Sequence, residues 1–492
     1  MKENLGIRMI NIILSKEEFI NEIHDLVKAF YPEEHIRIGK PSEASNEFDL
    51  QIIVELEDTI RISISNSKQL LYSDTGLVES KDKKVFRNYL KRMLYKGLSA
   101  ITQKELPWGT LTGVRPTKIA FERLELHMPK HEISQYMKDE FYCSDEKIET
   151  SLQVAERELE LLRKIDYKNG YSIYIGIPFC PSTCLYCSFT SYSLGKYESF
   201  VDQYLQALFQ EITYAGTCFI NKKLTTIYLG GGTPTTLSEE QLDLLLTHIR
   251  NSFDFTYVKE YTVEAGRPDS ITAEKLRILK MHGVSRISIN PQTMRQKTLD
   301  IIGRRHSVEQ VIQSFSMARE LGHDNINMDI IIGLPGETKE DIAYTLQEID
   351  KLKPDSLTVH TLALKRAARL NLEKEFYRKL APTDTQAMLA YTTIYAKESN
   401  YLPYYLYRQK NMADNLENIG YAHYGKEGLY NILIMEEKQT ILALGAGALS
   451  KFVFHEENRI ERVENVKSLK DYIERIDEMI TRKQEFFKKY TI

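Results

Sequence analysis

The sequence predicts an α/β fold, and three observations support this prediction. Between residues 171 and 364, short apolar runs alternate with helical patterns, which is typical of βα units around a parallel sheet. Residues 1–165 instead combine helical patterns with two alternating strand-like runs, which indicates a separate α+β domain. The region beyond residue 370 begins and ends with helical patterns, so we expect a C-terminal, mostly helical extension. The predicted domains are residues 1–165, 166–370 and 371–492.

The composition is that of an ordinary globular protein. Of the 492 residues, 42% are hydrophobic and 27% are charged, and the net charge of −4 indicates neither a nucleic-acid-binding nor an anionic-membrane-binding surface. No apolar run approaches the ~18 residues that span a bilayer. The apolar stretch Met9–Leu14 is too short for a signal-peptide core. We therefore expect a cytoplasmic protein, in which clustered thiols bind metal more often than they form disulfides.

The predicted N-terminal domain contains helices and a pair of strands. Apolar spacing predicts helices, and alternation with β-branched residues predicts strands, in this order: helix 16–30, strands 48–56 and 59–65, and helices 81–100 and 144–164. The segment Pro107–Pro116 is rich in proline and glycine and is predicted to be a loop. It holds the only tryptophan, Trp108, and either contacts another domain or a substrate, or packs within its own domain.

Six apolar runs predict the strands of the central sheet: Ser172–Ile177, Thr226–Leu229, Glu260–Glu264, Arg286–Ile289, Asn325–Ile332 and Ser356–Leu362. Helices between them begin at recognisable signals. Ser238 and Gln241 form a capping box, and Thr338 and Asp341 form another. The first of these helices should bury one face, made of Leu242, Leu245, Leu246 and Ile249. The closing stretch Lys467–Lys489 is predicted to be a solvated, charged helix.

Three of the five cysteines, Cys180, Cys184 and Cys187, lie within eight residues directly after the first predicted strand. Three thiolates can bind three irons of a [4Fe–4S] cluster and leave the fourth iron open to another ligand. A zinc ion would need a further ligand from elsewhere, since residues 188–193 contain neither cysteine nor histidine. Ordinary thiols are the remaining alternative. Cys143 and Cys218 are expected to be buried thiols.

Glycines or polar residues lie at the ends of the next four strands. Gly230–Pro234 follows the second strand, and glycine lets a backbone approach a ligand closely. Glu264 ends the third strand, Gln292 follows the fourth, and Asp329 lies in the fifth. Each polar residue alone is equally well explained as a cap or a satisfied buried group. Their succession at one edge of a parallel sheet predicts a ligand site there.

With these motifs the chain resembles the radical S-adenosylmethionine (radical SAM) superfamily, in which a CxxxCxxC loop follows the end of a strand. The resemblance implies a partial (β/α)6 TIM-like radical SAM barrel. It also implies a [4Fe–4S] cluster on Cys180, Cys184 and Cys187, whose open iron binds SAM. In that superfamily, electron transfer cleaves SAM to a 5′-deoxyadenosyl radical.

Within the superfamily, the chain resembles the oxygen-independent coproporphyrinogen III oxidase (coproporphyrinogen dehydrogenase) family, and most closely its HemZ-type branch. The shared motifs cover about residues 170–460 and include the cysteine loop, GGGTP, DIIIGLPGE and GAGALS. The family binds two SAM molecules. Position by position, the resemblance implies that the cluster-bound SAM contacts Tyr174, Gly231, Glu264 and Leu449. It implies that the second SAM contacts Tyr186, Gly232, Thr233, Gln292, Arg304, Asp329 and Ala363.

The implied reaction is oxidative decarboxylation of two propionates of coproporphyrinogen III to vinyl groups, giving protoporphyrinogen IX in haem biosynthesis. The partners are therefore a tetrapyrrole substrate and an electron donor and acceptor that the sequence does not identify. Because arginine pairs with carboxylates through two hydrogen bonds, Arg267 and Arg408 are candidate contacts for this polyanion.

Two departures from the oxidase pattern leave other activities open. Phe189 stands where the characterised oxidase has a fourth cysteine, and Gly176 stands where it has histidine. Related haem chaperones carry an HNxxYW segment, and the counterpart here, Tyr430–Met435, lacks the histidine and the tryptophan. The alternatives are a haem-binding, chaperone-like radical SAM protein and a radical SAM transferase that modifies tetrapyrroles.

Overall fold

The computed structural model describes residues 9–490 except positions 33, 40–47, 58, 79, 81, 188–190, 220, 364–383 and 410–414. The chain forms two compact units. The N-terminal unit comprises Met1–Glu156 and Tyr407–Glu417, and the barrel unit comprises Arg157–Leu406 and Asn418–Ile492. The segment Tyr407–Glu417 is called the returning segment here, because it brings a C-terminal part of the chain into the N-terminal unit.

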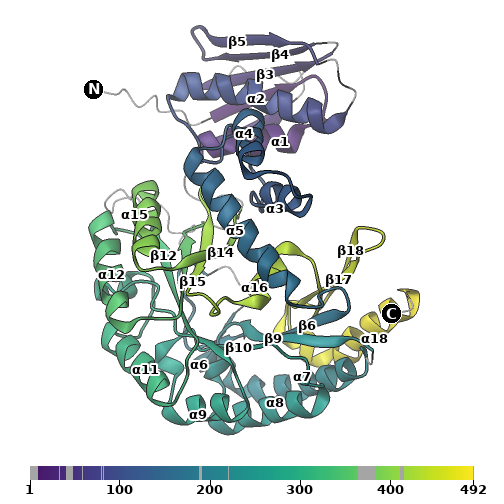
Figure 1. Ribbon diagram of the computed structural model, residues 1–492, viewed down its shortest axis with the longest axis vertical. Helices are drawn as coiled ribbons and strands as arrows, with labels where there is room; N and C mark the ends of the chain where they lie inside the picture. The colour runs from purple at the N-terminus through teal and green to yellow at the C-terminus, as the bar shows by residue number, and fades with distance from the viewer. Residues whose placement is uncertain are drawn as a thin grey trace. The chain divides into compact units, whose positions relative to one another are not determined.

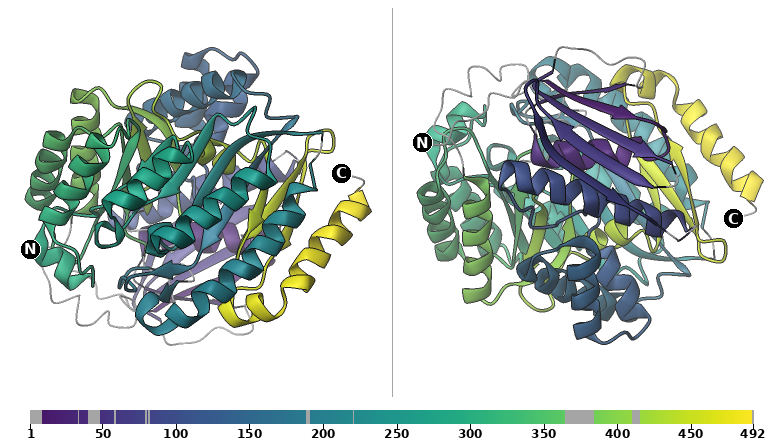
Figure 2. Two further views of the ribbon diagram at one scale, coloured as in Figure 1. Left: turned by 90° about the horizontal axis from the view of Figure 1, so that it is seen from below. Right: turned by 90° about the horizontal axis from the view of Figure 1, so that it is seen from above.

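The N-terminal unit contains a five-stranded sheet in the order β2-β1-β3-β4-β5. Its strands are β1 (Met9–Leu14), β2 (His35–Gly39), β3 (Leu50–Leu56), β4 (Ile60–Ser65) and β5 (Leu70–Gly76). β1 runs parallel to β2 and β3, whereas β3, β4 and β5 are antiparallel. The predicted strand pair is therefore confirmed as β3 and β4. The helices α1 (Ile20–Phe30) and α2 (Lys83–Thr102), both also predicted, cover one face of the sheet (Figure 2).

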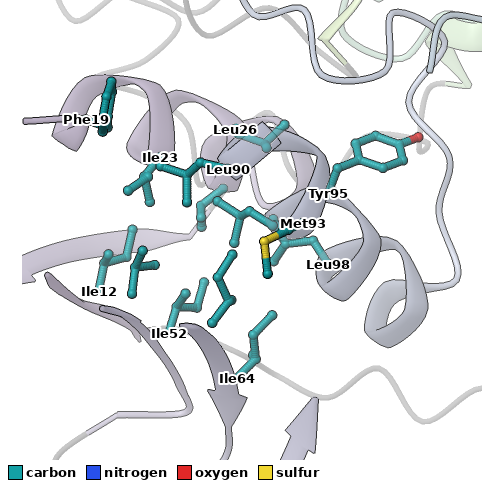
Figure 3. Packing of buried hydrophobic residues seen from close by; sticks show 14 of the residues in the cluster. Ile12, Phe19, Ile23, Leu26, Ile52, Ile64, Leu90, Met93, Tyr95 and Leu98 are labelled. Atoms are coloured by element: carbon teal, nitrogen blue, oxygen red, sulfur yellow. The ribbon is translucent and has the colours of Figure 1, made fainter. Parts of the chain in front are cut away.

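The core of this unit lies between the sheet and the two helices. Side chains alternate along β3 and β4, so that every second residue is buried. Ile12, Ile52 and Ile64 from the strands lie against Ile23 of α1 and Leu90 of α2 (Figure 3). All five side chains are at most 1% exposed. Every second side chain of the strands is apolar and points to one face of the sheet, and each helix has one apolar face. Packing these apolar faces together gives the two-layer arrangement.

Three further helices complete the first part of the chain: α3 (Lys118–Glu125), α4 (Lys130–Phe141) and α5 (Asp145–Arg163). The loop before α3 is buried at Trp108, whose Nε1 donates a hydrogen bond to Glu417 of the returning segment at 2.7 Å. Lys147 Nζ lies 2.7 Å from the other oxygen of the same carboxylate. These contacts support the interpretation of Pro107–Pro116 as a loop that packs within its own unit.

The barrel unit is built on six parallel strands that are neighbours in chain order. They are β6 (Gly170–Ile177), β9 (Lys223–Gly231), β10 (Glu260–Glu264), β11 (Arg286–Ser288), β12 (Ile326–Ile332) and β13 (Ser356–Thr361). The helices that follow them lie along the outside of the strands (Figure 1): α7 (Val201–Gly216), α8 (Glu239–Ser252), α9 (Ala273–Met281), α11 (Val308–Glu320) and α12 (Lys339–Leu352). The predicted fold class, a partial (β/α)6 TIM-like barrel, is confirmed.

The helix starts are those that the sequence predicts. Ser238 Oγ accepts a hydrogen bond from Gln241 N at 3.2 Å, and Gln241 Oε1 accepts one from Ser238 N at 3.0 Å. Asp341 Oδ2 accepts a hydrogen bond from Thr338 N at 3.0 Å. The four predicted apolar positions of α8 are all buried. These caps satisfy donors that a helix end otherwise leaves unpaired, and so fix where each helix begins.

The C-terminal extension adds strands as well as helices. The helices are α15 (Thr385–Glu398), α16 (Leu429–Glu436), α17 (Leu469–Glu474) and α18 (Ile476–Tyr490). The strands β14 (Leu402–Tyr407) and β15 (Asn418–Ala422) extend the sheet beyond β13. The strands β16 (Thr440–Leu444), β17 (Leu449–Phe454) and β18 (Arg459–Glu464) extend it beyond β6. The prediction of a mostly helical extension is therefore incomplete. Apolar runs of the C-terminal extension form strands that pair with both edge strands of the parallel sheet, β13 and β6.

The helix α16 lies inside the arc of parallel strands, where it packs against β9 (Figure 1). The carboxylate of Glu260 accepts hydrogen bonds from Leu429 N at 2.5 Å and from Tyr430 N at 3.1 Å, which satisfies donors at the first turn of the helix.

Among the residues that the structure describes, no helix is both long and apolar enough to cross a membrane.

Candidate active site

The three clustered cysteines lie in the loop after β6. Cys180 ends the short strand β7 (Phe179–Cys180), which pairs with β8 (Tyr192–Ser193). Cys184 is 8% exposed, and Cys180 and Cys187 are half-buried. Leu185 N donates to Ile302 O at 3.0 Å, which ties the loop to the barrel. Phe189, the residue that differs from the oxidase pattern, lies outside the described residues.

The guanidinium of Arg267 holds this loop. It forms an ion pair with Asp269 at 2.7 Å and donates to Ser182 O at 3.1 Å. Its Nη1 also lies 3.6 Å from Cys184 Sγ. The side chain is 3% exposed, so its donors are directed at the loop and not at open space. Arg267 therefore supports the cysteine loop, and its contact with a substrate carboxylate stays a prediction.

The three cysteine thiols are a donor set that suits an iron–sulfur cluster. Within the described ranges, no three histidine, cysteine, aspartate or glutamate side chains are arranged to hold one metal ion. A zinc ion bound to these thiols would take a further ligand from elsewhere in the chain. A [4Fe–4S] cube places each cysteine on a different iron. Burial, together with the neighbouring Cys187 and Cys184, raises the pKa of Cys180 to about 11, so a bound metal would replace a thiol proton there.

The GGGTP segment pairs with the start of the cysteine loop. Gly232 N donates to Ile177 O at 2.9 Å, and Thr233 N donates to Phe179 O at 2.7 Å. A Cβ at Gly232 would lie 2.6 Å from the carbonyl oxygens of both partners, so only glycine allows this approach. Thr233 Oγ1 donates to Cys180 Sγ at 3.5 Å. The GGGTP segment therefore places backbone without side chains directly beside Cys180.

Three tyrosine rings and Glu264 lie beside this backbone. The rings of Tyr174 and Tyr228 are stacked at 6.2 Å, and those of Tyr228 and Tyr430 at 4.5 Å. A Cβ at Gly231, which has φ +101, would lie 2.8 Å from the hydroxyl of Tyr174. Glu264 Oε1 accepts a hydrogen bond from the hydroxyl of Tyr228 at 2.5 Å. Burial, aided by the charge of a nearby aspartate, raises the pKa of Glu264 to about 7.

That nearby aspartate is Asp329, which faces His360 on the adjacent strand. Asp329 Oδ1 accepts a hydrogen bond from Asn327 Nδ2 at 2.6 Å, and its Oδ2 lies 3.6 Å from His360 Nε2. Burial alone would raise the pKa of Asp329, but hydrogen bonding and charge from His360 hold it below its usual value. His360 was not predicted from the sequence. The alternation along β13 was the available signal, since it places His360 on the same face as Thr358.

A second group of predicted residues surrounds Arg304, which is 7% exposed. Arg304 Nε donates to the hydroxyl of Tyr186 at 3.2 Å, and its Nη1 donates to Asn290 O at 2.7 Å. Gln292 has φ +67, a left-handed conformation that costs a non-glycine residue about 1–2 kcal/mol. Its backbone is fixed on both sides, since Gln292 N donates to Asp329 O at 2.9 Å and Ile331 N donates to Gln292 O at 2.9 Å.

The structure thus joins most of the predicted site residues through direct contacts. Ala363 lies two residues after the end of β13, next to residues outside the described part, and Leu449 begins β17 with 37% exposure. Their assignments, like the other ligand assignments, stay predictions. Arg408 belongs to the N-terminal unit. Tyr228 could not be predicted from the sequence either, because its place in the site depends on stacking with Tyr430, about two hundred residues later in the chain.

Comparison with known proteins identifies the class. Residues 174–349 match the model of the radical SAM superfamily. The coproporphyrinogen III oxidase HemN from Escherichia coli has a similar fold, with a TM-score of 0.50 and 24% identity over 65% of this chain and 73% of that chain. The match, the barrel and the cysteine loop at its strand ends define a radical SAM protein, a class that uses a [4Fe–4S] cluster and SAM.

The relatives define the branch. The chain is 43% identical over 412 residues to the oxygen-independent coproporphyrinogen-III oxidase-like protein HemZ of Bacillus subtilis, which covers 82% of each chain. It is 34% identical over 309 residues to the heme chaperone HemW of the same organism, covering 62% of this chain and 76% of HemW. The oxygen-independent coproporphyrinogen III oxidase of Salmonella typhimurium is 33% identical over 192 residues, or 39% of this chain and 42% of that one. The chain belongs to the HemZ-type branch of the oxygen-independent coproporphyrinogen III oxidase-like family, as predicted.

Proposed function

We propose that the protein is a radical SAM oxidoreductase that converts propionates of coproporphyrinogen III to vinyl groups without oxygen. The observation that carries this proposal is the backbone pairing of Gly232 and Thr233 with Ile177 and Phe179, which places a glycine cradle directly beside Cys180. When bound, the cluster and SAM would supply a carbon radical that removes hydrogen from the propionate side chain. The relationship to HemZ supports the substrate class.

The residues of the chain would bind and orient the reactants. Cys180, Cys184 and Cys187 would hold the cluster, and Arg267 fixes their loop. Glu264 can donate or accept a proton near neutral pH, because burial raises its pKa to about 7, and this suits contact with hydroxyl groups of a nucleoside. The stacked tyrosines line the adjoining space with aromatic surface, which limits the access of water to a radical site.

A second SAM would occupy the region around Arg304, Gln292 and Asp329. Asp329 stays ionised because its pKa lies below the usual value, so it can pair with an ammonium group. Two propionates would then consume two SAM molecules. An external donor must reduce the cluster, and an external acceptor must take the electron that is left when carbon dioxide departs.

A haem carrier is the second candidate, and the similarity to HemW favours it. The local structure argues for the enzyme instead. Tyr430, at the position of the chaperone histidine, is 4% exposed and stacks on Tyr228. Burial raises the pKa of Tyr430 well above its ordinary value. A buried, protonated phenol is a poor iron ligand, since tyrosine binds haem iron as the phenolate.

One experiment separates the two candidates. Anaerobically reconstituted protein is incubated with SAM, a reductant, a one-electron acceptor and coproporphyrinogen III, and the products are separated by chromatography. A parallel sample is incubated with haem and SAM. We expect vinyl product, carbon dioxide and 5′-deoxyadenosine, with about two SAM consumed per protoporphyrinogen. Cys184→Ala should lose iron and activity, whereas Cys218→Ala, a half-buried thiol outside the loop, should retain both. Stoichiometric haem retention without turnover would establish the carrier and overturn the proposal.

A further inference from the structure

Among the residues that the structure describes, Lys91 and Arg408 are buried cations of the N-terminal unit without a paired carboxylate. Lys91, on α2, is 9% exposed, and Arg408, in the returning segment, is 3% exposed. Across the described ranges, neither forms an ion pair, although other basic residues nearby do: Arg92 pairs with Glu140, and Lys147 pairs with Glu417. A buried charge without a partner costs several kcal/mol, so its presence requires an explanation.

Both cations contact the same short stretch of the Pro107–Pro116 loop. Lys91 Nζ donates to Thr112 Oγ1 at 3.1 Å. Arg408 Nη1 donates to Leu111 O at 2.6 Å, and Arg408 N donates to Val114 O at 2.8 Å. Arg408 Nε is buried and has no hydrogen-bond partner among the described residues. The loop therefore brings together an ammonium group, a threonine hydroxyl and a guanidinium edge with an unused donor.

The surrounding charges do not neutralise this cluster. The carboxylate that acts on Arg408 is Glu417, which is already engaged by Lys147 and by Trp108 Nε1. Glu22 and Asp25 act on Lys91, but Arg87 and Arg408 oppose them. Burial and these two cations lower the pKa of Lys91 to about 8, and burial lowers that of Arg408 to about 10. Among the described residues, the positive charge around Lys91 and Arg408 is therefore not balanced by carboxylates.

We propose that Lys91, Thr112 and Arg408 form a binding site for a small oxyanion, a phosphate or a carboxylate, in the N-terminal unit. One oxygen would accept from Arg408 Nε, and another from Lys91 Nζ. The hydroxyl of Thr112, which accepts from Lys91, keeps its own hydrogen for a third bond. Arg87, one helical turn before Lys91, adds positive charge to the same side of α2. The site does not depend on the reaction proposed for the barrel.

The full-length protein carries its own reporter for this site. Trp108 is the only tryptophan and lies in the same loop, so its fluorescence reports on the loop alone. Inorganic phosphate and succinate are titrated separately, with chloride at equal ionic strength as the reference. We expect a saturable change in Trp108 emission and a rise in Tm for the anion that fits. A response to phosphate alone identifies a phosphate ligand, and a response to succinate alone identifies a carboxylate.

Substitutions test whether the change arises at these residues. Lys91→Met should weaken binding at least tenfold, and should raise the Tm in chloride alone, because an unpaired buried charge is removed. Lys84→Met, at an exposed position of the same helix, should change neither. Arg408→Gln is a second variant that should bind the anion more weakly than the wild type. For succinate, whose charge is constant above about pH 7, binding to the wild type should weaken as the pH rises through 8, since Lys91 then loses its proton.

Two results would overturn the proposal. The first is the absence of any saturable response to both anions at concentrations where chloride has no effect. The second is an equal apparent Kd in the wild type, in Lys91→Met and in Arg408→Gln, which would show that the anion binds elsewhere.

Discussion

At the scale of single residues, the environment of each site residue decides its chemistry. Glu264 at the end of β10 and Asp329 within β12 are both half-buried carboxyl groups, yet their pKa values move in opposite directions. Burial dominates at Glu264, whereas His360 overcomes it at Asp329. The sequence identifies both carboxyl groups but cannot give this difference, because it depends on a histidine from a different strand.

Glu264 should make stability depend on pH. Its folded pKa of about 7 lies above its ordinary value of 4.5, so the folded state holds its proton longer than the unfolded state does. Stability should therefore fall as the pH rises from about 4.5 to 7 and stay lower above that. Glu264→Gln should raise the free energy of unfolding above pH 8 by about 2–3 kcal/mol, with no gain below pH 4.

Urea unfolding of the cluster-free protein across this pH range measures the effect. The exposed Glu240→Gln on α8 is the matched control and should leave the pH profile unchanged. A parallel profile for wild type and Glu264→Gln would contradict the assignment of the shift to this carboxyl group.

Gly232 should not tolerate a side chain. Its Cβ would come within 2.6 Å of two carbonyl oxygens, so Gly232→Ala must separate the GGGTP segment from the cysteine loop. We expect a loss of about 1–3 kcal/mol of stability and a loss of bound iron. Gly195→Ala is the control, because an added Cβ there meets nothing within 4 Å. Iron content and thermal unfolding distinguish the two variants, and equal iron content in both would count against the cradle.

At the scale of elements, α18 is attached to the barrel through a buried polar network. Lys483 Nζ lies 2.6 Å from Glu211 Oε1 of α7, and both side chains are fully buried. Glu211 also accepts hydrogen bonds from Tyr472 at 2.6 Å and from Gly445 N at 2.8 Å. The helix lies beside α7 and β18 (Figure 2). The prediction of a solvated helix was therefore wrong at this face, because the lysine finds its partner on an element far away in the chain.

Removing one partner of the Lys483–Glu211 pair should lower the free energy of unfolding more than replacing both charged groups by neutral ones. Lys483→Met leaves a buried carboxylate without its cation and should cost about 3–5 kcal/mol. The double variant Lys483→Met/Glu211→Gln should lose clearly less, since no uncompensated charge is left. Urea unfolding of the single and double variants gives the coupling energy through a double-mutant cycle. A double variant as unstable as the sum of the two single ones would show that the residues act independently.

At the scale of the whole molecule, the sequence predicts elements that depend on neighbouring residues. It does not predict contacts between segments that are far apart in the chain. The six parallel strands and the capping boxes follow from periodicity within ten or twenty residues, so they were predictable. The cysteine loop and GGGTP were predictable because the spacing of their residues is itself the signal. The strands β14 to β18 were not, since pairing depends on which sheet edge is open. The place of the returning segment in the N-terminal unit was missed for the same reason.

The returning segment should be required for the N-terminal unit to fold fully. A fragment of residues 1–156 lacks Glu417, so Lys147 and Trp108 lose their buried partner. We expect red-shifted Trp108 emission and reduced stability in the fragment, by about 2–4 kcal/mol. A synthetic peptide of residues 407–417 should restore the emission, whereas the same peptide with Glu417 replaced by glutamine should restore less. Native emission in the fragment alone would contradict this expectation.

Because the chain crosses between the two units three times, the N-terminal unit is encoded by two separate stretches of the gene. The chain passes between the units at residues 156–157, 406–407 and 417–418, so a protease that cuts at one of these points leaves two covalent links. Loss of the first 156 codons would likewise not remove the whole unit. The shortened gene would still encode Arg408 and Glu417, two buried charges whose neighbours had been deleted. Descendants that lack the N-terminal unit should therefore have lost both stretches of coding sequence.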